Sequence, residues 1–367
     1  MTTELPSRSV VSDILGSRIS WLLLLFPITV VVDVLLPGHK IWIFFLSAAA
    51  LVPLAHLLSV ATEQMSFHTS PTIGALLNVT FGNAGELLVG FFALRQGLDE
   101  VVKASITGSI LSNLLLALGV SVLIAGVRKK TLSFNPLAAR TRATLLALAG
   151  LSLILPAVYH YAAHAQGGPR ERDLSFAFSS ILLLTYGCAL LFTLHTHSQL
   201  LAARHDEKPE QSAWTKTASL LVLVMASCAI GWVSEILAGS IEAASKRLGL
   251  SDLFVGVILV ALFGNAAETL SAIRAALSER MDLSVGITLG SSTQVALFVA
   301  PALVIVSKWT GHHSMNLLFT PVEITSLVLA IAITGQIAGD GDSNWFEGVQ
   351  LLAVYLMLAV IFFLIPG

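Results

Sequence analysis

Long apolar stretches constrain the fold of this chain more than any other feature. A helix that crosses a bilayer needs about 20 apolar residues, and eleven stretches are close to this length. They are residues 19–36, 41–61, 72–94, 101–126, 142–162, 174–194, 216–238, 252–275, 283–307, 318–336 and 347–366. Only 11% of the 367 residues are charged, against about 25% in a soluble protein. We therefore expect an all-α polytopic membrane protein with about eleven transmembrane helices.

The remaining composition excludes several other classes of protein. The net charge of −2 gives no reason to expect nucleic acid as a partner. The two cysteines, Cys188 and Cys228, fall inside apolar stretches and fit no disulfide or zinc pattern. The first residues lack the order of a signal peptide, so we expect the first apolar stretch to be retained.

One short motif occurs twice. Residues 80–91 read TFGNAGELLVGF, and residues 262–273 read LFGNAAETLSAI. The shared pattern is Gly-Asn-Ala-x-Glu, at an offset of 268 − 86 = 182 residues. The stretches that follow the two copies, GSILSNLLLALG at 108–119 and GSSTQVALFVAP at 290–301, keep this offset. The chain therefore contains two related halves.

The number of helices in each half determines their relative orientation. The second to sixth stretches form one five-helix half, the seventh to eleventh form another, and the first is an extra helix. Because five is odd, the second half enters the membrane from the opposite side, which makes an inverted repeat of the kind used in alternating access. The expected divisions are an N-terminal segment with the extra helix at 1–40, a first repeat at 41–199, a cytoplasmic linker at 200–215 and a second repeat at 216–367.

Basic residues predict the orientation in the membrane. Of the 20 Lys and Arg residues, twelve fall on one side and eight on the other, with Lys103 counted among the eight. The positive-inside rule then predicts a cytoplasmic N-terminus and a C-terminus outside. Short connections and the lack of targeting extensions favour a prokaryotic plasma membrane.

Each copy of the motif carries one carboxylate, Glu86 or Glu268, inside an apolar stretch. A charge near the bilayer centre costs about 2.5–3.5 kcal/mol on insertion scales, so it indicates function. Asn83 and Asn265 precede these glutamates by three residues, which would place each pair on one face of a helix. A lone buried glutamate could serve helix packing. Two in matched contexts favour a single site shared between the halves.

The neighbouring residues could supply further oxygen ligands. The helices after the two motifs offer hydroxyl and amide groups from Ser109, Ser112, Asn113, Ser291, Ser292 and Gln294. Gly82, Gly85 and Gly264 weaken the helix locally and could free backbone carbonyls. Such oxygens suit a hard cation such as Ca²⁺, which takes 6–8 oxygen ligands. No His or Cys lies beside the two glutamates, which argues against zinc or copper.

The paired carboxylates also suggest what is exchanged. Two buried carboxylates without a cation repel each other, and burial favours their protonated form. Protons and a divalent cation would then compete for the same oxygens, which is the minimum that an antiporter requires. Na⁺ in place of protons would satisfy the same physics.

These residues resemble the Ca²⁺/H⁺ exchangers (CAX type) of the cation/calcium exchanger superfamily. The resemblance rests on GNAGELLVGFFAL (82–94), GNAAETLSAI (264–273), GSILSNLLLALG (108–119), GSSTQVALFV (290–299), LAHLLSVATEQ (54–64) and VSEILAGSIEAAS (233–245), and covers the chain from about residue 41 onward. It implies a ten-helix inverted-repeat core plus an extra first helix. It also implies a secondary transporter with no cofactor, for which Ca²⁺ is the transported substrate.

The resemblance further implies the site residues. Ca²⁺ would lie between Glu86 and Glu268, with supporting roles for Asn83, Asn265, Ser109, Ser112, Ser291 and Gln294. This chain departs from the pattern at Gly85, where relatives commonly carry Thr, and at Thr269, where they commonly carry His.

Three further carboxylates are candidates for a proton pathway. Glu63 and Glu235 lie near the ends of apolar stretches, and the resemblance places both near the proton path; the alternative is interfacial carboxylates without a transport role. Glu323 begins the tenth stretch as an interfacial anchor or a proton site. The implied partners are Ca²⁺, H⁺ and the lipid bilayer, and association into a homo-oligomer is left open.

Two alternatives to Ca²⁺/H⁺ antiport follow from the sequence. A Na⁺-coupled Ca²⁺ exchanger, or an exchanger of Mn²⁺ or another divalent ion, would keep the fold and change the ions. A membrane protease is suggested by the Gly-x-Gly-Asp pattern at 339–342. That pattern falls in a polar loop and lacks a paired membrane aspartate, so we expect a transporter and not an enzyme.

Overall fold

A computed structural model describes most of the chain as helices. The described residues are 18–162, 169–196, 214–309 and 314–366. Within these ranges the two strands are β1 (Leu132–Ser133) and β2 (Asp342–Ser343), which pair antiparallel.

The helices follow the order expected from the apolar stretches. The extra N-terminal segment contains η1 (Arg18–Leu24) and α2 (Leu25–Leu35). The first half contains α3 (Lys40–Ser66), α4 (Pro71–Gly82), α5 (Ala84–Arg95), α6 (Asp99–Leu111), η2 (Ser112–Ala117), α7 (Leu118–Arg128), α8 (Pro136–Ala162), α9 (Pro169–Leu191) and η3 (Phe192–Thr196). The second half contains α11 (Lys216–Leu248), α12 (Asp252–Phe254), η4 (Val255–Val260), α13 (Ala261–Gly264), α14 (Ala266–Leu277), α15 (Met281–Gln294), η5 (Val295–Val299), α16 (Ala300–Ser307), α17 (Pro321–Asp340) and α18 (Trp345–Leu364). Segment η1 is a 3₁₀-helix, and η2 to η5 are π-helical.

The number of membrane spans differs slightly from the expectation. Among the described residues, eight helices are long and apolar enough to cross a membrane, and two bent pairs raise the number to ten. The first expected span is a shorter apolar helix, Trp21–Leu35. The all-α multi-pass architecture is therefore confirmed, whereas the count of eleven is not.

Local sequence signals fix several helix ends. Ser70 precedes Pro71 and caps α4 with its hydroxyl, and the Asn344 side chain caps α18 by accepting from two backbone amides. Gly341 ends α17 in the left-handed conformation at φ 78°, which glycine adopts without steric cost.

The chain divides into two compact units that do not coincide with the two sequence repeats. Unit 1 comprises Met1–Val89 and Asp206–Ala244, and unit 2 comprises Gly90–His205 and Ser245–Gly367. Each unit thus takes helices from both repeats, α3, α4 and α11 in unit 1 and the later helices in unit 2. Most of the expected linker at 200–215 lies outside the described residues.

Within unit 1, α2 packs along α3. The ring of Phe26 on α2 contacts Trp232 on α11 edge to face, with centroids 6.1 Å apart. Trp214 is buried just before α11, and its backbone carbonyl oxygen lies 2.8 Å from His68 Nε2, within hydrogen-bond distance. These contacts join α11 and the residues just before it to the extra helix α2 and to the turn that follows α3.

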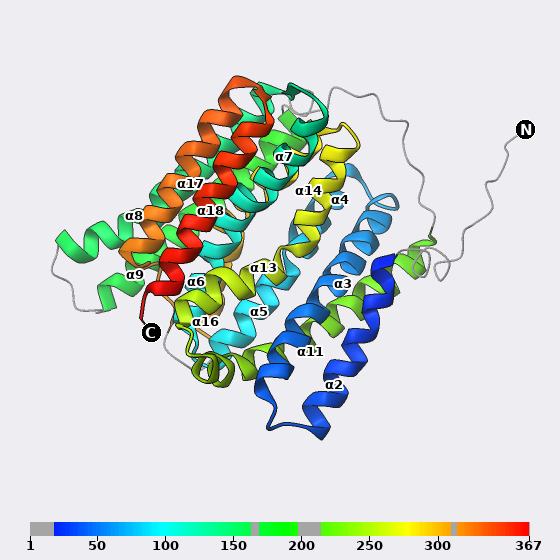
Figure 1. The fold of residues 1–367 in the computed structure, drawn as a ribbon, viewed down its shortest axis with the longest axis vertical. Coiled ribbons are helices and arrows are strands. Elements are labelled where there is room, and N and C mark those ends of the chain that lie inside the picture. The colour runs from blue at the N-terminus through cyan, green and yellow to red at the C-terminus, as the bar shows by residue number, and fades with distance from the viewer. Residues whose placement is uncertain (1–17, 163–168, 197–213, 310–313, 367) are drawn as a thin grey trace, which may run out of the picture. The chain divides into compact units, whose positions relative to one another are not determined.

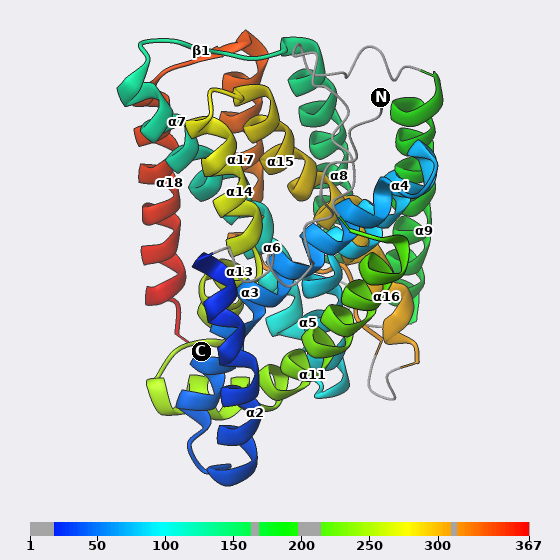
Figure 2. The same cartoon turned by 90° about the vertical axis from the view of Figure 1, so that its right-hand side faces the viewer.

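Within unit 2, small residues allow close helix packing. Helices α7, α17 and α18 run side by side (Figure 1), and a Cβ atom added at Gly348 of α18 would lie 2.5 Å from the Leu123 backbone nitrogen of α7. Such backbone approach is typical of membrane helix interfaces. The connection that contains β1 runs across one end of this unit from α7 to α8 (Figure 2).

Candidate functional site

The two copies of the motif form two broken helices. Helix α4 ends at Gly82 and α5 begins at Ala84 with a bend of 46°, and the bend between α13 and α14 is 54°. The expected weakening next to the glycines therefore occurs. However, Asn83 and Asn265 are the non-helical residues themselves, with φ, ψ of −108°, 18° and −94°, 9°. The prediction that each asparagine and its glutamate share one face of a single helix is wrong, because the asparagine is the hinge between two helices.

Both asparagines bond the flanking half-helices in the same way. Asn83 Nδ2 donates to the carbonyl of Val79 at 3.2 Å, and Asn265 Nδ2 donates to that of Ala261 at 2.8 Å. The backbone carbonyl of each asparagine accepts the amide four residues later, at 3.0 and 2.9 Å. Each asparagine thus closes one half-helix and starts the next.

The two glutamates occupy the start of the second half-helices. Glu86 lies in the first turn of α5, and Glu268 lies in the first turn of α14. The partial positive charge of a helix N-terminus stabilises a carboxylate, while the carbonyl end of the preceding half-helix attracts a cation. Each break therefore presents an anchored carboxylate next to backbone oxygens, which is suited to cation binding.

The second break is held by residues of α6 and η2. Asn265 Nδ2 donates to Ser109 Oγ at 2.9 Å, and Asn113 Nδ2 donates to Asn265 Oδ1 at 3.1 Å. All three side chains are buried. Two residues predicted as ligands, Ser109 and Asn265, are thus in direct contact, although they lie 156 positions apart in the chain.

Three oxygens near this break are buried without a hydrogen-bond partner among the described residues. They are Glu268 Oε2, Ser112 Oγ and Asn113 Oδ1. A buried polar group left unpaired costs about 1–3 kcal/mol. All three atoms are oxygens that a hard cation accepts as ligands, so the donor set of unit 2 fits such a cation.

Two π-helical segments lie at matched positions. Segment η2 ends at Ala117 and η5 ends at Val299, an offset of 299 − 117 = 182 residues. Ser112 begins η2, and Gln294 immediately precedes η5. Two predicted ligands therefore sit where the helical hydrogen-bond ladder shifts, a feature frequent at functional sites.

On α15, Gln294 has a partner that the sequence did not indicate. The side chain of Gln294 hydrogen-bonds with the hydroxyl of Tyr186 on α9. The Tyr186 ring stacks on Phe298, with centroids 5.9 Å apart. Ser291, the other predicted ligand on α15, is partly exposed. No local pattern distinguishes Tyr186 from its apolar neighbours.

The remaining predicted site residues divide between the units. In unit 1, Asn83 is buried, Glu86 is half-buried, and Glu63 and Glu235 are exposed on α3 and α11. In unit 2, Glu323 is buried at the start of α17. The sharing of one cation by Glu86 and Glu268 stays a prediction.

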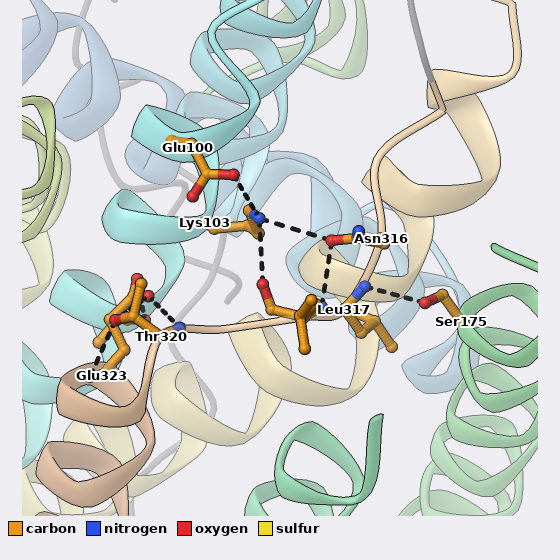
Figure 3. Close-up of polar contacts among 9 residues, drawn as sticks. Glu100, Lys103, Ser175, Asn316, Leu317, Thr320 and Glu323 are labelled. Carbon is orange, nitrogen blue, oxygen red and sulfur yellow. Dashed lines mark hydrogen bonds and ion pairs between the residues drawn. The ribbon is translucent and has the colours of Figure 1, made fainter. Parts of the chain in front are cut away.

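One charged residue lies in an unexpected place. The charge count assigned Lys103 to the outer side of the membrane, and the structure shows that its side chain is buried near the start of the span that α6 begins. The extended segment before α17 accepts a hydrogen bond from this side chain, since Lys103 Nζ donates to the Leu318 carbonyl at 3.0 Å. Figure 3 shows Lys103 beside Asn316 and Leu317 of this segment.

Comparisons with known proteins agree with this architecture. The family described as sodium/calcium exchanger protein matches residues 39–195 and 218–364. The Ca²⁺/H⁺ antiporter of Synechocystis sp. is 40% identical over 343 residues, covering 88% of this chain and 91% of the relative. The Ca²⁺/H⁺ antiporter ChaA of Bacillus subtilis is 40% identical over 327 residues, covering 88% and 92%.

Solved structures share the fold. The structure of native YfkE has a TM-score of 0.81 and 37% identity, over 94% of this chain and 100% of that chain. The H⁺/Ca²⁺ exchanger CAX, at 16% identity, has a TM-score of 0.71. The family match covers most of the chain and the two bacterial relatives match over nearly their whole length. The chain therefore belongs to the sodium/calcium exchanger protein family.

Proposed function

We propose that this protein is a secondary active antiporter that exchanges Ca²⁺ for H⁺ by alternating access. The observation that carries the proposal is the matched pair of broken helices, each with a glutamate in the first turn after the break. Similar proteins from two bacteria are named Ca²⁺/H⁺ antiporters, which supports these ions over Na⁺-coupled exchange.

In the proposed cycle, Glu86 and Glu268 bind either the cation or protons. Neutral oxygens complete the cation site, and we assign these to Asn83, Asn265, Ser109, Ser112, Ser291 and Gln294. The unpaired buried oxygens of Ser112 and Glu268 support this assignment. Because protonation removes the negative charge that binds Ca²⁺, protons and Ca²⁺ cannot occupy the two glutamates at the same time. Exchange, and not co-transport, follows from this competition.

We assign protons a route that includes Glu63 and Glu235, whose exposed carboxylates can exchange protons with their surroundings. Glu323 remains a prediction as a proton site and is tested below. We also propose a prokaryotic plasma membrane location, a cytoplasmic N-terminus and an outward C-terminus. The transport reaction requires no cofactor and no covalent step.

The test is ⁴⁵Ca²⁺ uptake into proteoliposomes that contain the purified protein. We expect an imposed pH gradient without Na⁺ to drive uptake and a protonophore to abolish it. Uptake only under a Na⁺ gradient would keep the fold and overturn the counter-ion. Absence of uptake under both gradients would contradict Ca²⁺ as the substrate, and Mn²⁺ would be tried next.

A further inference from the structure

A buried polar junction joins α6 to the start of α17 within unit 2. We call Lys103, Thr107, Thr320 and Glu323 the α6–α17 junction; Figure 3 labels Lys103, Thr320 and Glu323. Glu323, 1% exposed, accepts from the Thr320 backbone amide at 2.8 Å and from the Thr320 hydroxyl at 2.7 Å. Its other oxygen accepts from the Thr107 hydroxyl of α6 at 3.2 Å. One carboxylate therefore caps α17 and bonds α6.

Lys103 provides the positive charge of this junction. Its ammonium group interacts electrostatically with Glu323 and donates to the Leu318 carbonyl and to Asn316 Oδ1, at 3.0 and 3.4 Å. It also pairs with Glu100 at 2.7 Å. A buried charge is costly unless it is paired and hydrogen-bonded, and here both charges meet that condition.

The segment at 314–320 is part of the same arrangement. Its backbone runs extended, and Figure 3 shows Asn316, Leu317 and Thr320 along it, with Lys103 and Ser175 within reach. The Leu317 amide donates to Ser175 Oγ of α9 at 3.1 Å, and the Met315 amide donates to Ser307 Oγ of α16 at 2.9 Å. Side chains of several helices thus satisfy a backbone that has no strand partner there.

An equivalent junction joins α15 of the second repeat to α8 of the first. We call Asp282, Arg142 and Asn135 the α15–α8 junction. The carboxylate of Asp282, on α15, accepts the backbone amide of Asn135, whose own side chain caps α8. Arg142 of α8 interacts electrostatically with Asp282 and lies against Gly286, where an added Cβ would approach its Nη1 to 2.7 Å.

The two junctions contain the same kinds of groups, but the helices that carry the carboxylate and the cation are exchanged. Helices α6 and α15 correspond, since they begin at Asp99 and Met281 with an offset of 281 − 99 = 182. In each junction a carboxylate accepts the amide that precedes the fourth helix of a repeat, and a cation balances it. The carboxylate is on α17 and the cation on α6 in one, whereas the carboxylate is on α15 and the cation on α8 in the other.

Both junctions lie on the helices that carry the proposed ligands. Thr107 is two residues before Ser109, and Asp282 is nine residues before Ser291. An α-helix is a rigid rod that rises about 1.5 Å per residue. A shift of α6 or α15 along its own axis therefore moves the ligand oxygens that it carries by the same distance. A misplacement of about 1 Å is enough to weaken a preorganised site.

We propose that the two junctions are positioning groups that set the axial position of α6 and α15 and thereby the affinity of the cation site. This inference rests on the proposed function, because the ligands it positions are those assigned above. Under this proposal Glu323 does not carry protons. It is a fixed anion that is hydrogen-bonded to Thr320 and to Thr107 of α6.

The test compares Thr107→Val, Lys103→Met, Glu323→Gln and the double variant Lys103→Met/Glu323→Gln in proteoliposomes. We expect Thr107→Val to raise the Ca²⁺ concentration at half-maximal uptake about threefold to tenfold, with the maximal rate and its pH dependence unchanged. The two charge variants should raise it further. In the double variant, the factor by which the half-maximal Ca²⁺ concentration rises should be smaller than the product of the factors of the two single variants, because the double variant leaves no uncompensated buried charge.

Thr325→Val is the matched control, since Thr325 lies in the same helical turn of α17 as Glu323 and its exposed hydroxyl donates to the Pro321 carbonyl of its own helix. Unchanged half-maximal concentrations in Thr107→Val and in both single charge variants would overturn the proposal. A Glu323→Gln variant with a shifted pH dependence and an unchanged Ca²⁺ requirement would assign Glu323 to the proton pathway instead.

A second readout separates this proposal from the proposed function. Ca²⁺-induced thermal stabilisation of the detergent-purified protein measures cation affinity without transport. If the wild type stabilises with Ca²⁺ but does not exchange it for H⁺, the proposed function fails. The junction proposal then still requires that Thr107→Val shift the stabilisation midpoint to higher Ca²⁺, and an unshifted midpoint overturns it.

Discussion

The two broken helices are alike at the hinge and different around it. Both break at an asparagine that bonds the carbonyl four residues earlier, and both place a glutamate in the following first turn. Before the first break, α4 is α-helical from Pro71 to Gly82, whereas the π-helical η4 lies shortly before the second break. The hinge geometry therefore follows from the five-residue motif, and the packing around it is specific to each repeat.

Packing differs most clearly at two corresponding glycines after the motifs. A Cβ atom added at Gly108 of α6 would overlap the backbone of Val257 in η4, whereas one added at Gly290 of α15 would meet no described atom within 4 Å. Gly256 of η4 also lies close to α6, with an added Cβ 2.5 Å from Ala104 Cβ. One repeat thus needs glycine for backbone contact where the other does not.

The largest expected effect is the loss of either hinge carboxylate. We predict that Glu86→Gln and Glu268→Gln each reduce Ca²⁺ transport at least about hundredfold, because each would remove one charged ligand of the proposed cation site, and loss of one partner of a charge pair costs about 2–5 kcal/mol. Folding should be retained, as checked by size-exclusion chromatography. Uptake measurements on both variants would show whether the hinges are equivalent in function. Transport retained by both would contradict the site.

The next largest effect tests the difference in packing between Gly108 and Gly290. Gly108→Ala should lower the free energy of unfolding by about 3 kcal/mol, because overpacking of this contact forces α6 and η4 apart. Gly290→Ala is the matched control and should change stability by no more than about 0.5 kcal/mol. Thermal unfolding in detergent measures both. Equal effects would mean that the two repeats pack alike.

A smaller effect tests the hinge bonds. Asn265→Asp keeps the side-chain shape but cannot donate to the Ala261 carbonyl, so we expect a loss of about 1–3 kcal/mol in stability. Asn83→Asp removes the corresponding bond to Val79 and should lower the melting temperature in the same direction. If only one of the two variants loses stability, the hinges are not structurally equivalent.

The smallest effect concerns a difference inside the motif. Gly85 occupies the position of Ala267 in the other copy, and a Cβ added there meets no described atom within 4 Å. Gly85→Ala should therefore raise stability by about 0.5–1 kcal/mol through helix propensity alone. A lower melting temperature would show that the first hinge needs the flexibility of glycine.

Much of the fold was predictable because the bilayer imposes a simple length rule. Apolar stretches located the helical segments, and the repeated Gly-Asn-Ala-x-Glu motif located both breaks. The role of Asn83 and Asn265 as hinges was missed, since a spacing of three residues fits a continuous helix equally well. The π-helical turns at η2 and η5 could not be predicted, because the pattern of apolar residues is the same there as in an ordinary α-helix.

Contacts between distant segments were not predictable from local patterns. The Asn265–Ser109 bond joins residues 156 positions apart, and Tyr186 reaches Gln294 from another helix. The buried position of Lys103 depends on a backbone segment more than 200 residues later, since the separation from Leu318 is 215 positions. A local signal did exist for Glu323, because Thr320 and Glu323 have the spacing of a capping box.

The most direct test is to follow protons and Ca²⁺ in the same vesicles. Proteoliposomes with a preformed pH gradient and a pH-sensitive dye would receive Ca²⁺ in Na⁺-free buffer. We predict that Ca²⁺ discharges the gradient with the wild-type protein and not with Glu86→Gln or Glu268→Gln. A gradient that Ca²⁺ leaves intact with the wild type, or discharges equally with both variants, would contradict exchange of Ca²⁺ for H⁺ at the two hinge glutamates.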